Sequence, residues 1–190
     1  SIFFICFLVF PSVVGLLILA PILINIVPRY EKWAPALIPL ALISINTVFA
    51  AVTTQLTNLL NSIGKIKTTF KLMVMWTTLA WLLVPALAIK YGVNGAALGY
   101  ALVGSSSLIA IYVARRFVKF SLREAVLRPL AASTIMAIIL LITRSNLPFN
   151  LTSVWILIAV GIFIYAVSSY LTVGVSIVSD VRKSIYTLFS

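Results

Sequence analysis

The sequence predicts an all-α membrane protein, a polytopic bundle of six transmembrane helices with both ends on the cytoplasmic side. Hydrophobic residues make up 63% of the 190 residues, and the mean hydropathy is +1.20. Only 9% of the residues are charged, whereas soluble domains average about a quarter. So few charges cannot cover a water-facing surface. Lys and Arg also gather in alternate connections between apolar segments, as in membrane proteins with several spans.

Six apolar segments are close to the roughly 20 residues that a spanning helix needs. The fifth is short, and we expect it to borrow its first turn from the basic segment before it. In that segment Ser121 and Glu124 have capping-box spacing, and Pro129 should kink the chain, so we predict a short interfacial helix over about 121–128. The six predicted spans cover about residues 2–27, 36–60, 72–89, 94–113, 130–143 and 153–178.

The distribution of basic residues predicts the orientation. Cytoplasmic loops of membrane proteins carry an excess of Lys and Arg. Ten of the 14 basic residues fall in the second loop, the fourth loop and the tail, and four fall in the other loops. We therefore expect a multi-pass protein of the cytoplasmic (cell) membrane that begins and ends on the cytoplasmic side. The Lys and Arg that set the orientation of the loops then account for most of the net charge of +11, and we expect no nucleic-acid partner.

The inventory of reactive side chains is small. The chain has no histidine, one cysteine (Cys6) and three acids (Glu31, Glu124 and Asp180). Neither a transition-metal site nor a Ser-His-Asp, Cys-His or paired-carboxylate centre can be assembled from this set. We therefore predict a protein that is not an enzyme and uses no cofactor or metal. No acid lies inside a predicted span, so a membrane carboxylate for ion coupling would have to come from outside this chain.

The second apolar segment carries a stripe of polar side chains, which we call the polar stripe. On a helix that turns about 100° per residue, Asn46, Thr53, Thr57 and Asn61 fall within about 80° of one another. Lipid cannot satisfy amides and hydroxyls, so these residues should face protein or a water-filled cavity. Hydrogen bonding between helices and a hydrated path for a neutral, hydroxyl-rich cargo both fit. The second interpretation makes these residues candidates to line a substrate path.

Three lysines, Lys65, Lys67 and Lys71, follow the stripe at its predicted cytoplasmic end. They are candidates to attract a phosphate at the mouth of the path. The alternative is that they serve only as orientation signals.

Glycines mark two turns and one packing face. Gly64 and Gly92 each follow a predicted helix, where a left-handed residue commonly ends the helix. Gly95 and Gly99 have the small-xxx-small spacing at which two membrane helices approach closely. The chain starts inside an apolar run, at Ser1, so we expect it to be the later part of a longer protein.

Two of these turns resemble those of a known family. Residues 61–67 read Asn-Ser-Ile-Gly-Lys-Ile-Lys, and residues 90–99 read Lys-Tyr-Gly-Val-Asn-Gly-Ala-Ala-Leu-Gly. Both are similar to turns of the polysaccharide (O-antigen type) flippases in the multidrug/oligosaccharidyl-lipid/polysaccharide exporter superfamily. The resemblance implies a C-terminal lobe that moves lipid-linked oligosaccharide across the cytoplasmic membrane by alternating access, for surface polysaccharide synthesis. It also implies an N-terminal lobe of the same protein, membrane lipids and glycan-assembly enzymes as partners.

Other functions remain as alternatives. A multidrug/cation antiporter of the same superfamily would have an aromatic, acid-lined cavity, and the lack of a membrane acid weighs against it. A membrane glycosyltransferase or polymerase needs acidic or histidine catalytic residues near a membrane face, and this chain has too few. A non-catalytic membrane assembly subunit is the third alternative.

Overall fold

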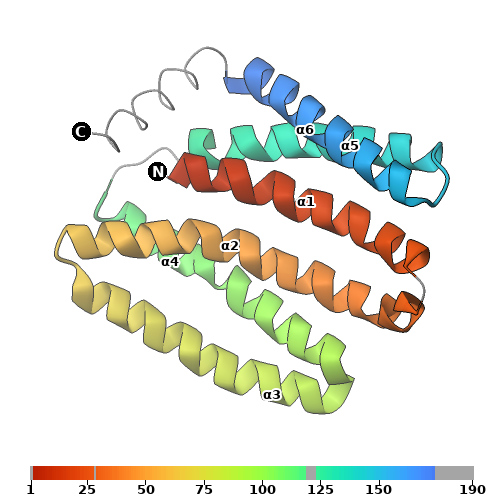
Figure 1. Ribbon diagram of the computed structural model, residues 1–190. Helices are drawn as coiled ribbons and strands as arrows, with labels where there is room; N and C mark the ends of the chain where they lie inside the picture. Colours follow the sequence, from red (N-terminus) through yellow and green to blue (C-terminus); the bar gives the residue numbers. More distant parts are fainter. Residues whose placement is uncertain (1, 28, 119–122, 174–190) are drawn as a thin grey trace.

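A computed structural model describes residues 2–27, 29–118 and 123–173 of the chain. The described residues are almost entirely helical and contain no strand, and the helices lie side by side in one bundle (Figure 1). The elements are α1 (Ile2–Ile26), the 3₁₀ helix η1 (Tyr30–Ala36), α2 (Leu37–Ser62), α3 (Ile66–Ser105), α4 (Ser107–Arg115), the π-helical turn η2 (Arg123–Leu127), α5 (Arg128–Ser145) and α6 (Leu151–Val173).

Five helical segments in the described part of the chain are long and apolar enough to cross a membrane. This confirms the predicted all-α architecture and makes a multi-pass membrane protein plausible. The third segment, Ile66–Arg115, is 50 residues long and contains two of the six predicted spans. A straight helix of that length would measure about 75 Å, against about 30 Å for the hydrocarbon core of a bilayer. The segment therefore has to bend.

The bend lies at Gly92, whose backbone (φ 61°, ψ −143°) is not helical. After it, the second arm of α3 folds back along the first arm. A Cβ atom built on Gly95 would lie 2.6 Å from the carbonyl carbon of Leu87, and one on Gly99 would lie 2.9 Å from Cα of Val84. Such approaches are possible only without a side chain. The two glycines thus bring the two arms of one hairpin together.

The turn between α2 and α3 also depends on a glycine. Gly64 takes the left-handed conformation (φ 75°), as predicted. Its N–H donates to the carbonyl of Asn61 at 3.0 Å, and the N–H of Lys65 donates to the carbonyl of Leu60 at 2.8 Å. These two bonds form a Schellman motif, which satisfies the last carbonyls of α2 and reverses the chain.

Two apolar clusters form the core, and α1 contributes to both. α1 lies between α2 on one side and α5 and α6 on the other (Figure 1). The first cluster joins α1 to α2, α3 and α4 through Cys6, Phe10, Val52, Leu56, Leu60, Leu72, Ala110 and Ala114. The second joins α1 to α5 and α6 through Ile18, Ile22, Ala132, Met136, Leu140, Val154, Leu157 and Tyr165.

Two predicted segments lie partly outside the described residues. Of the interfacial helix expected over 121–128, only the part from Arg123 onward is described, and it forms η2 and the first residue of α5. Pro129 follows at once, and because it has no N–H it cannot donate to the carbonyl of Ala125. Of the sixth predicted span, 153–178, the residues after Val173 lie outside the described part.

Candidate functional site

The polar stripe lies on α2 and faces the interior over its central part. Thr53 and Thr57 are buried, each only 6% exposed. Asn46 is half-buried, and Asn61 is exposed at the end of the helix. The structure therefore places two of the four stripe residues inside the bundle and one at its end.

The hydroxyls of the stripe donate to their own helix. Thr53 Oγ1 donates to the carbonyl of Phe49 at 3.0 Å, and Thr57 Oγ1 donates to the carbonyl of Thr54 at 2.9 Å. Such bonds allow a hydroxyl to sit in an apolar region. The oxygen lone pairs remain able to accept from another group.

Asn46 packs against the second arm of α3. A Cβ atom added to Gly104 would lie 2.7 Å from Oδ1 of Asn46 and 2.8 Å from its Cα. Gly104 thus lets the two helices meet at the asparagine. Asn46 thus packs closely between the two helices. Its amide makes no hydrogen bond to another described residue, so the expected hydrogen bonding between helices is not seen at Asn46.

Two further polar atoms lie buried on the first arm of α3. Thr69 Oγ1 and Trp76 Nε1 have no hydrogen-bond partner among the described residues. Thr69 and Trp76 are seven residues apart, so they lie on the same face of the helix as Leu72. Leu72 belongs to the same apolar cluster as Leu56 and Leu60 of α2. Buried donors without partners are costly in an apolar medium. The seven-residue spacing of Thr69 and Trp76 is visible in the sequence, whereas the lack of a partner for each polar atom is seen only in the structure.

The predicted phosphate-binding lysines lie at one end of the bundle. Lys65, Lys67 and Lys71 are exposed, and Nζ of Lys65 lies 5.0 Å from the ring centroid of Phe117. This contact places the turn between α2 and α3 beside Phe117, which follows α4. Figure 1 shows that turn and the end of α4 at the same end of the bundle. We call this end the basic end; its described cations include Lys65, Lys67, Lys71, Arg115 and Arg116.

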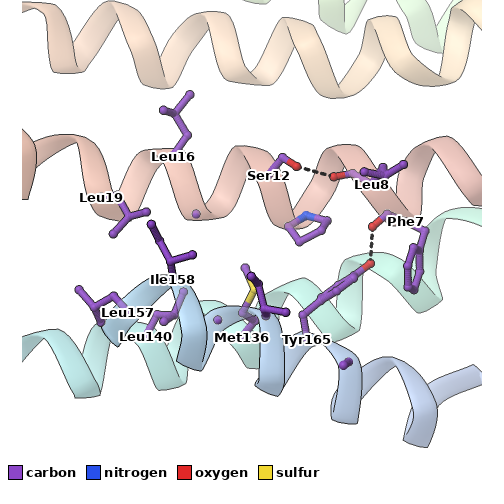
Figure 2. A pocket seen from close by; sticks show the side chains of 15 residues that line it. Phe7, Leu8, Ser12, Leu16, Leu19, Met136, Leu140, Leu157, Ile158 and Tyr165 are labelled. Carbon is purple, nitrogen blue, oxygen red and sulfur yellow. Dashed lines mark hydrogen bonds between the residues drawn. The ribbon is translucent and has the colours of Figure 1, made fainter. Parts of the chain in front are cut away.

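A groove of about 610 Å³ is formed by α1, α5 and α6 (Figure 2). Most of its lining is apolar, including Leu16, Leu19, Met136 and Leu157. None of the four stripe residues lines it, nor do they line the smaller groove between α2 and α4. The larger groove was not foreseen, because it is formed by residues from three distant parts of the chain.

Tyr165 makes a polar contact between α6 and α1 at this groove. Its hydroxyl, on α6, donates to the backbone carbonyl of Phe7 on α1 at 2.7 Å (Figure 2). That carbonyl has no normal helical partner, because the residue four positions on is Pro11, which lacks an N–H. A freed carbonyl in a membrane helix needs a donor from elsewhere. Pro11 was the signal that such a donor exists; only the structure identifies it as Tyr165.

Together these observations define the class of the protein: an all-α bundle of membrane-spanning length with a partly polar interface between two of its helices. Among the described residues, no group of three or more His, Cys, Asp or Glu side chains lies together in a way that could hold a metal ion. Comparison of the chain with protein-family models, with curated proteins and with solved structures gave no match in any of the three.

Proposed function

We propose that this chain is a membrane lobe of a transporter that flips lipid-linked oligosaccharide across the cytoplasmic membrane by alternating access. The observation that carries the proposal is the presence of buried polar groups on the neighbouring helices α2 and α3. Thr53 and Thr57 are buried on α2, and Thr69 and Trp76 carry buried polar atoms on α3 that have no partner among the described residues. Polar groups without a partner are costly in an apolar medium, and a hydrated path or a bound head group would supply one.

The chemistry of this lining suits a sugar. Hydroxyls, an amide and an indole N–H can exchange hydrogen bonds with a neutral, hydroxyl-rich head group, without the cost of burying a charge. The exposed lysines of the basic end supply a place for the phosphate of the carrier lipid. The resemblance of residues 61–67 and 90–99 to turns of polysaccharide flippases supports the same assignment, and it implies a second, N-terminal lobe.

The test is to remove the polar groups of the stripe from the full protein that carries this chain. A variant with Asn46→Leu, Thr53→Val, Thr57→Val and Asn61→Leu is expected to reduce surface glycan to the level of a strain without the protein. Surface glycan is measured by labelling, and membrane insertion by quantifying the protein in isolated membranes. A matched control, Thr47→Val with Thr134→Val, removes two exposed hydroxyls that bond only their own helices, and it should export normally. Normal export by the stripe variant would refute the proposal.

We further propose that both arms of the α3 hairpin cross the membrane, which makes six spans with the basic end in the cytoplasm. Single cysteines introduced into a Cys6→Ala background test this topology with a membrane-impermeant maleimide on whole cells. Cysteines at Lys90 and Arg144 should be labelled from outside, whereas those at Lys67 and Arg116 should be labelled only after the cells are opened. Labelling of positions 67 and 90 from the same side would contradict the six-span arrangement.

A further inference from the structure

We propose that the groove between α2, α4 and η2 holds one acyl chain of an anionic phospholipid, whose phosphate binds the guanidinium of Arg115. The groove has a volume of about 360 Å³. Its walls include Val48 and Val52 of α2, Leu108 and Ile111 of α4, and Val126 and Leu127 of η2. These side chains are aliphatic, and two phenyl rings, of Phe10 and Phe49, complete the described apolar wall.

Among the residues whose side chains the structure describes, Arg115 is the one charged residue that lines this groove. Its side chain is exposed, and it makes no ion pair or hydrogen bond with the described part of the chain. The neighbouring cations are engaged differently. Arg116 donates to the hydroxyl of Tyr112 at 2.8 Å and stacks on its ring, and Lys65 lies over Phe117. Of these three described cations, Arg115 is the one whose charged group makes no such contact.

The dimensions favour a lipid chain over a protein segment. A helix with its side chains is about 10–12 Å wide, and a groove of this volume cannot take one. From Arg115 to Leu108 the wall of α4 extends about 10 Å away from the basic end. An apolar slot of this depth that opens beside a cation matches the two parts of a phospholipid, an acyl chain and a phosphate. The surrounding Lys65 and Arg116 add positive charge, which favours an anionic head group over a zwitterionic one.

This lipid is distinct from the transported cargo of the proposed function. It would occupy the groove between α2, α4 and η2, and it would contact all three elements through their apolar side chains. Its binding does not depend on whether the protein moves oligosaccharide.

Native mass spectrometry of the purified full protein, with phosphatidylglycerol or phosphatidylethanolamine added to the detergent, tests the site. Arg115→Gln is expected to reduce the retention of phosphatidylglycerol about fivefold, since a cation near the membrane surface contributes about that factor. Arg115→Lys should keep most of the retention. Leu108→Trp, which places a ring in the groove from an exposed position, should lower it as well. The matched control is Arg144→Gln, which removes a cation at the opposite end of the bundle and should have no effect.

Three results would overturn the proposal. One is equal retention of phosphatidylglycerol by the wild type and Arg115→Gln. The second is an equal loss in Arg144→Gln, which would indicate only a general charge effect. The third is displacement of the bound lipid by excess inorganic phosphate, which would show that the site recognises a free anion and not a lipid.

Discussion

Replacing Gly95 by alanine is expected to open the α3 hairpin and destabilise the whole bundle. The new methyl group would lie 2.6 Å from the carbonyl carbon of Leu87 and 2.9 Å from Cβ of Tyr91. The first of these is a backbone atom, which cannot move aside as the end of a side chain can. Overpacking in a core commonly costs about 1–3 kcal/mol, and we expect this substitution to reach the upper end of that range or exceed it.

The measurement is the midpoint of thermal unfolding of the purified protein in detergent. The control is Gly15→Ala in α1, where an added Cβ meets no atom within 4 Å. Since alanine favours a helix over glycine by up to about 1 kcal/mol, the control should be neutral or slightly stabilising. Equal unfolding temperatures for Gly95→Ala and Gly15→Ala would contradict the close approach of the two α3 arms.

The second large effect is expected at the contact between α6 and α1. Tyr165→Phe removes the donor that satisfies the carbonyl of Phe7, and we expect a loss of about 1–2 kcal/mol of stability. Pro11→Ala restores the missing helical N–H, so the same carbonyl gains an internal partner. In the Pro11→Ala background, Tyr165→Phe should therefore cost clearly less than it does in the wild type.

A double-mutant cycle measures this coupling from the unfolding free energies of the four proteins. The control is Tyr170→Phe, an exposed tyrosine on the same helix that should leave stability unchanged. Strict additivity of Pro11→Ala and Tyr165→Phe would show that the tyrosine does not compensate for the proline. The hydrogen bond from Tyr165 to Phe7 would then be energetically independent of Pro11.

Much of the architecture could be predicted because it depends on local chemistry. Apolar segments of spanning length favour helices in a membrane, since a helix pairs its backbone groups within one segment. Gly64 ends α2 in the left-handed conformation because that position suits a residue without a side chain. The stripe on α2 follows from helical periodicity alone, and Thr53 and Thr57 are indeed buried. Residue type and spacing were sufficient at each of these points.

The partners of these groups were decided by the tertiary structure. Nothing local to Phe7 indicates that a tyrosine 158 residues away supplies the missing hydrogen bond. The same holds for Asn46, whose neighbour Gly104 arrives only because α3 folds back at Gly92. Both grooves are built from three or more elements. The sequence by itself thus determined which groups in this chain need a partner. Only the packing of the helices decided which partner each group meets. The reason is that a contact between distant segments depends on the placement of every helix between them.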